Sequence, residues 1–541
     1  MKNTCAYTNE IKNIKQKTEL AGIYFVLLAV LSALPDIMAA LGLKLLPVHI
    51  VAAAAVQLAA IIGVLWAGKE VLRHGIVQLA AGEPCRDSLL AVGSVVIFFH
   101  GSYWLIWQAA GNDAAGGAVY FAPLALSVFI TLMGRWLTQQ AAASDHDEQD
   151  KMAAVLVPAA FSIAVIAGLS WRFYSGSNMG WNICAASLLM AYPAALGLAR
   201  PVSLLRGLAA ATAKGVDVKN AAALQNAGKL TLAILCDKGT VTDEKIKLTD
   251  VIAIKGSSEQ MILNLAVSLT QYETCRDHQL SQALAQVAVD KGVRGDLLCS
   301  DFVYEDKAGV RARCQKVKVG LGSENYIKKL CRLPKEAEQH SSQLAAEGKT
   351  ILYLAADGHL CGIFAFAYLP KENSKEEIIC LHNAGLRTML VTSRSQQEAA
   401  HTASQVQLAE YTAGLSPAEQ AEFAASIQMG GETAAVIGST DADAAVMQQG
   451  AVSASLRGSQ VASDITLKSI DRMADMVAIS RKMARIMQQN IFWAIVFNIA
   501  GLLPAVGIVY AFGGAVPGVF LLSLVQLLGS LCVMLNSLRL H

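Results

Sequence analysis

The stretch "LAILCDKGTVTDE", Leu232–Glu244, decides the fold. It begins as an apolar run and changes abruptly to short polar residues at Asp237. A buried parallel strand has such a continuous apolar sequence, and the residue that follows it lies at the carboxyl edge of the sheet, where ligands bind. Asp237 is therefore either a nucleophile at that edge or a strand-end carboxylate that caps a helix or pairs with a cation.

Two more apolar runs end in the same way. "TMLVTS" ends at Thr392 and Ser393, and "TAAVIGS" ends at Ser439. A helix-compatible segment follows each run, which predicts a doubly wound α/β domain whose site lies where the strands end. Residues 248–358 separate the first strand from the others and have mixed α and β character, so an inserted α+β domain is expected there.

The composition indicates an integral membrane protein with a soluble part. Of the 541 residues, 54% are hydrophobic and 16% are charged, whereas a soluble domain has roughly 25% charged residues. The net charge of +2 predicts no nucleic-acid partner. A bilayer span needs about 20 mostly apolar residues. Eight stretches qualify: Glu19–Leu43, Pro47–Ala67, Ser88–Ala110, Ala118–Leu137, Met152–Trp171, Met179–Ala199, Ile491–Phe512 and Val516–Leu538.

Basic residues predict the orientation of the chain in the cell membrane. The loops "GNDAAGGA" and "YAFGG" carry no Lys or Arg. The N-terminal tail and the loop between spans two and three carry several: Lys2, Lys12, Lys15, Lys17, Lys69, Arg73 and Arg86. By the positive-inside rule, both termini and the long region after span six face the cytoplasm. The eleven cysteines form no C-x-x-C pair, which favours reduced cytosolic thiols over a disulfide scaffold.

The motifs along the chain resemble those of the heavy-metal-transporting P-type ATPases. "YPAALGLARP" (Tyr192–Pro201) is similar to that family's CPCALGLATP, and "DKGTVT" (Asp237–Thr242) is similar to its phosphorylation motif DKTGTLT. Four further stretches follow family motifs, namely "YETCRDHQLSQALA", "AGLRTMLVTSRS", "TAAVIGSTDADAAV" and "QNIFWAIVFNIAGLLPAVGIVYAFGG".

The resemblance implies an eight-span α-helical membrane bundle that carries a cytoplasmic haloacid-dehalogenase-like α/β domain with an inserted nucleotide-binding-type domain. The expected parts are a tail (1–18), spans one to six (19–200), a phosphorylation-type domain in two pieces (201–247 and 359–489), the nucleotide-type domain (248–358), and spans seven and eight (490–541).

Two parts of the family pattern have no counterpart in this sequence. The short acidic loop "QQAAASDHDEQDK", Gln139–Lys151, stands where the family has an actuator domain with a TGE motif. The tail before span one is too short for the family's N-terminal metal-binding domain. We therefore expect a degenerate member that lacks both domains.

The resemblance assigns a catalytic set centred on Asp237. Asp237 would accept the phosphoryl group from ATP, with Lys238, Thr240 and Thr392 around the phosphate and Asp443 on Mg²⁺, so that ATP and Mg²⁺ are the implied cofactors. For Asp443 a helix N-cap is the favoured alternative.

The neighbours of this set depart from the family pattern. The loop after Asp237 is one residue short, and a misplacement of about 1 Å can cost ~10²-fold in rate. Arg394 replaces the Asp of the family's TGD, Gln420 replaces its phosphate-binding Lys, and Ser439 replaces a Mg²⁺ carboxylate. We expect the Arg394 guanidinium to lie near Asp237, and the catalytic set to be vestigial.

The resemblance also places nucleotide-binding residues in the inserted domain. Glu273, His278 and Gly309 stand at family positions, although the Pro after the His is Gln279 here. The alternative for His278 is a surface histidine on a helix.

The transport path is altered at its centre. Tyr192 and Ala194 stand where the family has two thiolates in span six, and Pro193 between them is retained and should break the helix. No metal-ligating residues are therefore predicted. Asn498 and Gln526 are polar residues of spans seven and eight, and a hydrogen bond between them across the helices is the favoured interpretation.

Two functions follow from this reading, in different classes. The first is a catalytically impaired pseudo-pump with a regulatory, assembly or sensing role, embedded in the lipid bilayer beside another membrane protein. The second is a divergent ATP-driven heavy-metal cation transporter that is phosphorylated at Asp237. A protein that has lost its role is a third reading.

Overall fold

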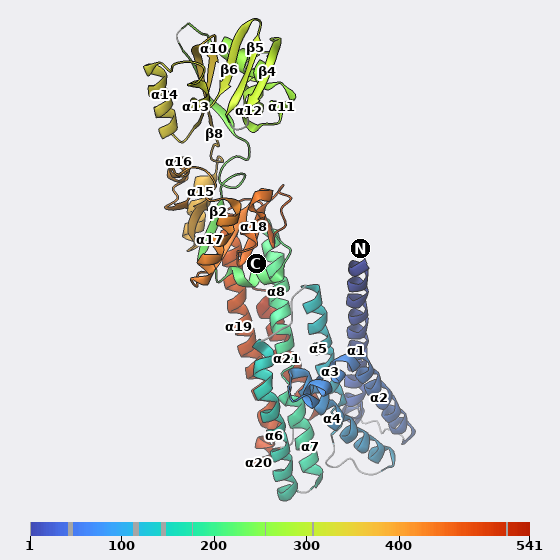
Figure 1. Ribbon diagram of the computed structural model, residues 1–541. Coiled ribbons are helices and arrows are strands. Elements are labelled where there is room, and N and C mark those ends of the chain that lie inside the picture. Colours follow the sequence, from blue (N-terminus) through green and yellow to red (C-terminus); the bar gives the residue numbers. More distant parts are fainter. Residues whose placement is uncertain are drawn as a thin grey trace. The chain divides into compact units, whose positions relative to one another are not determined.

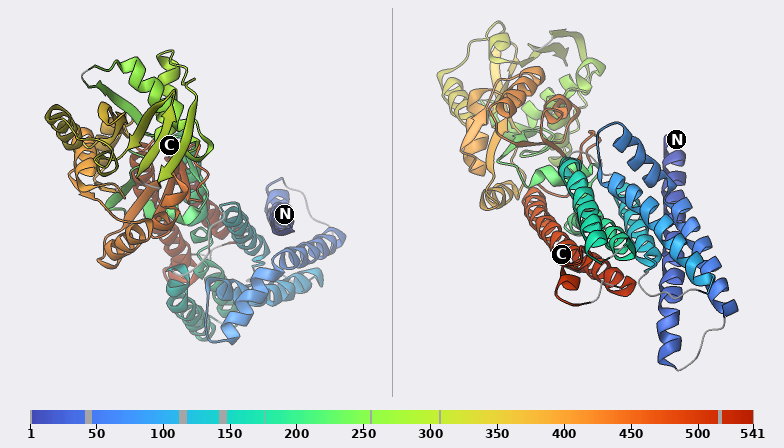
Figure 2. Two further views of the ribbon diagram at one scale, coloured as in Figure 1. Left: turned by 45° about the horizontal axis from the view of Figure 1, so that its top comes forward. Right: turned by 90° about the horizontal axis from the view of Figure 1, so that it is seen from below.

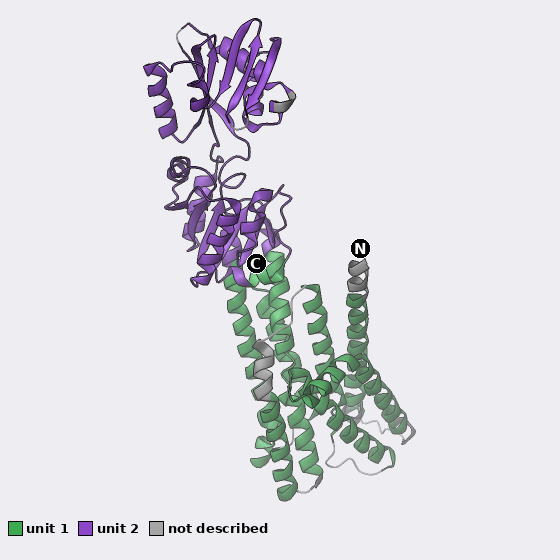
Figure 3. Cartoon of the chain, in the orientation of Figure 1, with its two compact units in different colours: residues 1–210, 220–225, 479–541 green, residues 211–219, 226–478 purple. Residues whose placement is uncertain are grey.

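The computed structural model describes residues 2–41, 47–111, 118–141, 148–175, 177–254, 256–305, 308–514 and 518–540. The chain forms two compact units (Figure 3). The helical unit comprises residues 1–210, 220–225 and 479–541, and the α/β unit comprises residues 211–219 and 226–478.

The helical unit contains the predicted membrane spans. Within the described ranges, eight helices are long and apolar enough to cross a membrane, which confirms the predicted number. The predicted ends at Leu43 and Val516 lie outside the described residues. Helices α1, α2 and α5 pack against one another, as do α6 and α7 (Figure 2). The helices of this unit are α1 (Lys2–Ala40), α2 (Pro47–Ala67), α3 (Lys69–Ala80), α4 (Arg86–Ala109), α5 (Phe121–Gln140), α6 (Glu148–Ser175), α7 (Ser177–Ala191), α8 (Leu196–Ala213), α9 (Ala221–Ala227), α19 (Arg472–Ala505), α20 (Ile508–Ala511) and α21 (Val519–Ser537).

The sixth span is broken at Pro193, as predicted. Helix α7 ends at Ala191 and α8 begins at Leu196. Proline has no backbone N–H to donate, so the regular i to i−4 ladder stops there. The N–H of Ala194 donates to the carbonyl of Tyr192 at 2.9 Å instead of to that of Met190. The Met190 carbonyl therefore loses its helical donor in the interior of a span.

The α/β unit contains a sheet that orders the three predicted strand ends side by side. In the described chain this sheet has seven strands in the order β1-β13-β12-β11-β2-β9-β10, all parallel except β1. The strands β11, β2 and β9 are neighbours and end before Ser439, Asp237 and Thr392, so the predicted edge is confirmed. The strands are β1 (Val216–Val218), β2 (Leu232–Cys236), β9 (Arg387–Val391), β10 (Glu410–Thr412), β11 (Ala434–Gly438), β12 (Val452–Leu456) and β13 (Ile465–Leu467).

Helices cover this sheet on both faces, as expected for a doubly wound fold (Figure 1). All five residues of β2 are buried. The helices are α15 (Ser374–Asn383), α16 (Gln396–Val406), α17 (Pro417–Met429) and α18 (Ala444–Met447), with the 3₁₀ turn Asp441–Asp443 before α18.

A second sheet forms the inserted domain. Its six described strands are antiparallel in the order β3-β8-β7-β6-β5-β4, and α10 and α12 pack on one face. The strand β8 pairs with both β3 and β7, so this sheet extends to Ala367, beyond the expected boundary at residue 358. The elements are β3 (Lys247–Ala253), α10 (Glu259–Thr270), α11 (Glu273–Arg276), α12 (Gln279–Asp290), β4 (Cys299–Glu305), β5 (Gly309–Cys314), β6 (Val317–Gly322), α13 (Glu324–Ile327), α14 (Lys335–Ala346), β7 (Thr350–Ala356) and β8 (His359–Ala367).

One pair of cysteines departs from the expectation of reduced thiols. Cys299 and Cys314 are directly opposite each other on the antiparallel strands β4 and β5. They form a disulfide in the structure. Because the two residues are far from adjacent in sequence, only the strand register brings them together.

Candidate functional site

The side chain of Asp237 is buried at the carboxyl end of β2 and is held by three donors. The residue as a whole is 4% exposed. Its Oδ2 accepts hydrogen bonds from Thr392 Oγ1 and from Arg394 Nη1, both at 2.9 Å. Its Oδ1 accepts from Thr242 Oγ1 at 3.0 Å. Both carboxylate oxygens therefore have partners within the protein.

The Arg394 guanidinium is the counter-ion of this carboxylate. Its side chain is 8% exposed, and that of Asp237 is 3% exposed, so the ion pair is shielded from solvent. The guanidinium carbon lies 5.4 Å from the ring centre of Tyr368, and the Lys238 ammonium lies 5.0 Å from the same ring. The predicted approach of Arg394 to Asp237 is confirmed, whereas Lys238 points to Tyr368. A cation on an aromatic face gains roughly 0.5–2 kcal/mol.

The shortened loop after Asp237 folds back on its own backbone. The N–H groups of Thr240, Val241 and Thr242 all donate to the Asp237 carbonyl, at 3.3, 3.0 and 3.1 Å. Gly239 has a φ of +73°, which an L side chain rarely adopts. Among the described residues, the buried Thr240 Oγ1 has no hydrogen-bond partner. The predicted phosphate ligand Thr240 is therefore not hydrogen-bonded to the Asp237 side chain, and Thr242 is.

Asp443 closes the neighbouring loop instead of facing Asp237. Its Oδ2 accepts from the backbone N–H of Ser439 at 3.0 Å and from both the N–H and the hydroxyl of Thr440 at 2.9 Å. Thr440 and Asp443 form a capping box at the turn before α18. Thr440 is the N-cap of this box and Asp443 is its N3 residue, whose carboxylate accepts from the N-cap amide. Asp443 is also the N-cap position of α18 but makes no side-chain capping hydrogen bond there.

The donor set at this edge does not fit a Mg²⁺ ion of the kind that the resemblance implies. Mg²⁺ is held by carboxylate oxygens in near-octahedral geometry. One carboxylate here is paired with Arg394, and the other is engaged by the loop after β11. The amide of Gln420, which stands in place of a cationic phosphate ligand, donates to the Leu415 carbonyl at 2.9 Å.

A cavity lies beside the loop that follows Asp237. Its volume is about 490 Å³, and residues from three strand ends line it, including Gly239, Ser439, Lys371 and Arg457. The Lys371 ammonium donates to the Gly239 carbonyl. Burial lowers the pKa of Lys371, and the carboxylates of Glu377 and Asp243 oppose this shift. Lys371 and Tyr368 lie in the stretch "DGHLCGIFAFAYLPKENSKEEI", which is similar to a family motif, but the sequence assigned neither residue to the site.

Two of the three predicted nucleotide residues make contacts within the inserted domain that account for their positions. His278 is exposed and is the N-cap of α12, where its Nδ1 accepts from the Leu280 N–H at 3.3 Å. Gly309 begins β5, and a Cβ there would lie 2.6 Å from the Tyr326 ring, so packing accounts for this glycine. The side chain of Glu273 lies outside the described residues.

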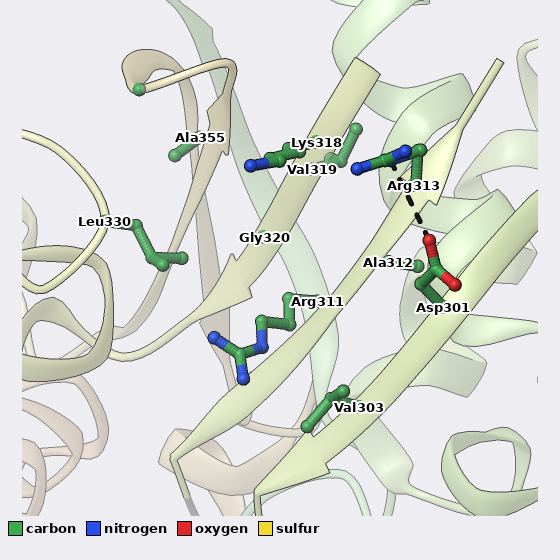
Figure 4. A pocket seen from close by; sticks show the side chains of 11 residues that line it. Asp301, Val303, Arg311, Ala312, Arg313, Lys318, Val319, Gly320, Leu330 and Ala355 are labelled. Atoms are coloured by element: carbon green, nitrogen blue, oxygen red, sulfur yellow. Dashed lines mark ion pairs between the residues drawn. The ribbon is translucent and has the colours of Figure 1, made fainter. Parts of the chain in front are cut away.

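The inserted domain has a different pocket, on the face of its sheet opposite α10 and α12. Figure 4 shows the basic side chains Arg311, Arg313 and Lys318 around it, with Arg313 paired to Asp301 at 3.8 Å. Its volume is about 430 Å³. Alternation along β5 explains its position, since Val310 and Ala312 face the helices and the two arginines face away.

The five residues predicted for the transport path do come together. Tyr192, Pro193, Ala194, Asn498 and Gln526 line one cavity. Its volume is only about 20 Å³, which is close to that of a single water-sized probe. The Tyr192 hydroxyl hydrogen-bonds with Thr131 Oγ1 at 2.7 Å.

The two polar residues of the last spans do not bond each other, which corrects the expectation. The amide of Asn498 donates to the Met190 carbonyl at 2.7 Å, the group that the break at Pro193 leaves without a helical donor. The amide of Gln526 donates to Ser127 Oγ at 3.1 Å. The unwound backbone therefore determines the partner of Asn498, which the sequence could not specify.

Comparisons with known proteins agree with this arrangement. A family model described as haloacid dehalogenase-like hydrolase matches residues 233–450. A probable copper-transporting ATPase, PacS, of Synechococcus elongatus is 29% identical over 453 residues, which is 80% of this chain and 60% of that protein. A probable copper-exporting P-type ATPase of Mycobacterium tuberculosis is 27% identical over 80% of this chain and 57% of that protein.

A solved structure of a zinc-transporting PIB-type ATPase in its E2.Pi state has the same fold. Its TM-score is 0.73 at 17% identity, with 97% of this chain and 99% of that chain covered. Over most of its length the chain is therefore similar to copper-transporting P-type ATPases, and it shares the fold of a zinc-transporting one. It spans 60% or less of the length of the first curated relatives that it matches.

Proposed function

We propose that this protein belongs to the heavy-metal P-type ATPase family and is a pseudo-pump, a membrane protein that keeps the architecture of the family for a regulatory, assembly or sensing role. One observation carries the proposal: the buried Arg394 guanidinium lies 2.9 Å from Oδ2 of Asp237. A carboxylate nucleophile needs a free oxygen that faces the phosphoryl group. Arg394 and Thr392 occupy one oxygen of Asp237, and Thr242 occupies the other.

Two further features support the loss of energy coupling. Helix α5 ends at Gln140 and α6 begins at Glu148, so the segment between them is too short to hold a dephosphorylating domain. The cavity at Pro193 offers a phenol, two amides, apolar groups and the Met190 thioether. The described residues that line it include neither a thiolate nor an imidazole, the groups that most often hold soft or borderline metals together with thioethers. In this proposal both termini and the α/β unit face the cytoplasm, and another membrane protein receives the signal.

The second candidate is a divergent ATP-driven cation transporter, and a specific observation favours it. Asp237 keeps its place at the end of β2, and a cavity whose lining includes the cations Lys371 and Arg457 as well as two carboxylates lies beside its loop. In a cycling enzyme that cavity would receive phosphate oxygens, and ATP would be the phosphoryl donor.

An assay for acid-stable phosphoenzyme distinguishes the pseudo-pump from the transporter. The full chain in detergent is incubated with γ-labelled ATP and Mg²⁺, quenched in acid and counted. We expect no incorporation above that of Asp237→Asn, because both oxygens of Asp237 are engaged. Asp441→Asn is the matched control, since Asp441 is an exposed carboxylate in the loop after β11. Label that persists in Asp441→Asn and disappears in Asp237→Asn would establish the transporter instead.

A further inference from the structure

Helix α4 follows α3 along the chain (Figure 1). Three side chains with metal-binding chemistry meet at the junction of the two helices. His74 is on α3, Cys85 is the N-cap of α4, and Asp87 is in the first turn of α4. One ligand atom from each side chain lies within 4.8 Å of the other two. None of these residues belongs to the catalytic set or to the cavity at Pro193.

Gly75 and Ser88 hold α3 and α4 close together at this junction. Gly75 lies so close to α4 that a Cβ there would be 2.2 Å from the Asp87 carbonyl oxygen. Ser88 Oγ donates to the Gly75 carbonyl at 2.8 Å and accepts from the Cys85 N–H at 3.1 Å. These contacts place His74 beside the first turn of α4, so the cluster is positioned before any ion binds.

The separations suit a tetrahedral ion. His74 Nδ1 lies 3.2 Å from Asp87 Oδ2 and 3.9 Å from Cys85 Sγ. Zinc bonds of about 2.0–2.3 Å to nitrogen, oxygen and sulfur require ligand atoms about 3.3–3.7 Å apart at tetrahedral angles. The ligand atoms of Cys85 and Asp87 lie within 4.8 Å of each other, so side-chain movements of up to about 1 Å would complete the coordination.

An unsatisfied oxygen marks the position of the ligand. Asp87 is 5% exposed, and its Oδ2 is paired with Arg135 and His74. Its Oδ1 is buried and has no hydrogen-bond partner among the described residues. A buried carboxylate oxygen without a partner is costly, and a cation satisfies it. The side chain of His74 is 50% exposed, which leaves an open side for the ion and for a water as fourth ligand.

We propose that His74, Cys85 and Asp87 form a binding site for Zn²⁺ outside the transport path. On binding, the Cys85 thiol releases its proton to solvent and coordinates as thiolate, His74 coordinates as neutral imidazole through Nδ1, and Asp87 coordinates through a carboxylate oxygen. The mixed nitrogen, sulfur and oxygen donors suit a borderline divalent ion and disfavour Mg²⁺ and Ca²⁺. The site does not depend on the proposed function, because no step of ATP chemistry is involved.

Cobalt is the spectroscopic probe for this site. The full chain in detergent is reduced, freed of reductant and titrated with Co²⁺, and then with Zn²⁺. We expect a thiolate-to-cobalt charge-transfer band that saturates at one Co²⁺ per chain and is abolished by Zn²⁺. Competition with a colorimetric chelator then measures the affinity for Zn²⁺.

The variants isolate the cluster from the other thiols. Cys85→Ser should lose the band and bind Zn²⁺ at least ~10-fold more weakly, since even outer partners of metal ligands are worth about 10–100-fold. Serine is a favoured N-cap, so this variant keeps the start of α4. His74→Asn should weaken Zn²⁺ binding to a similar extent. Cys380→Ser removes an exposed thiol elsewhere and should change neither the band nor the affinity for Zn²⁺. A wild-type chain without the band, or a band that survives Cys85→Ser, overturns the proposal.

Discussion

Replacing Arg394 by alanine tests whether the buried ion pair holds the edge of the sheet together. Removal of one partner of a buried pair typically costs about 3–5 kcal/mol, because the other charge stays buried alone. Asp237 would keep the hydroxyl donors Thr392 and Thr242, at 2.9 and 3.0 Å. We therefore expect a loss near the lower end of that range, about 3 kcal/mol in the free energy of opening this edge.

Cys236 reports this opening, because it is the last residue of β2. Its exposed fraction is 1%. Burial raises the pKa of the Cys236 thiol well above its usual value, and the carboxylates of Asp443 and Asp237 add to the shift. The thiol can react only in molecules that have opened locally. Its labelling rate, resolved by mass spectrometry, should rise roughly 100-fold in Arg394→Ala, since each 1.4 kcal/mol is a factor of ten.

The matched control removes an arginine from the same sheet at an exposed position. Arg387 begins β9, its side chain is 53% exposed, and it pairs with Glu410 and Glu432 at 2.8 Å. Exposed ion pairs contribute about 0–1 kcal/mol, so Arg387→Ala should accelerate labelling of Cys236 by less than about fivefold. Equal labelling rates in Arg394→Ala and Arg387→Ala would refute the idea that the buried pair stabilises this edge.

Three further predictions concern other parts of the chain. Asn498→Ala should destabilise the helical unit by about 1–2 kcal/mol in a denaturant titration in detergent, because it removes the donor of the Met190 carbonyl. Gln526→Leu should destabilise the unit less, since the Gln526 Oε1 is already unpartnered among the described residues. A larger loss of stability in Gln526→Leu than in Asn498→Ala would contradict this assignment. Although burial opposes the charge of Asp250, hydrogen bonds from Lys349 and Thr249 lower its pKa. An acid with a lowered pKa in the folded state contributes stability that is present above its unfolded pKa of about 3.9 and is lost as the pH falls. Lys349→Met should therefore flatten the decline of the urea midpoint below pH ~4, and an unchanged decline would count against the pair. An alkylating reagent should modify Cys299 and Cys314 only after reduction, as read by mass spectrometry. Cys314→Ser should lower the stability of the inserted domain by about 3 kcal/mol, the value expected for a disulfide that closes a loop of this size. Full alkylation without reductant would restore the expectation of free thiols.

The parts of the fold that follow from local patterns were predicted correctly from the sequence. The apolar runs that end at Asp237, Thr392 and Ser439 predicted strands whose ends share one edge, and the structure places β11, β2 and β9 side by side. The number of spans and the break at Pro193 also followed, because helix length in a bilayer and the missing N–H of proline are local properties.

Partners across the fold were predicted less well. The expected hydrogen bond between Asn498 and Gln526 does not form. The unwound backbone leaves the Met190 carbonyl without a helical donor, and the Asn498 amide donates to it instead. Thr242 lies in the stretch "DKGTVT", but neither it nor Tyr368 or Lys371 was assigned a role at the site from the sequence, because their contacts depend on the fold. The cluster of His74, Cys85 and Asp87 was also missed, because it depends on the close approach of Gly75 to α4.

The sequence by itself determined the architecture and the substitutions at the site. Hydrophobic length, strand periodicity and the replacement of family residues by Arg394, Gln420 and Ser439 are visible along the chain. The tertiary structure alone decided what those substitutions do. Whether Arg394 faces solvent or neutralises Asp237 depends on the packing of β9 beside β2, and the structure brings the two charges to 2.9 Å in a site shielded from water. Electrostatic interactions depend on distance and on burial, and neither quantity is a property of sequence position.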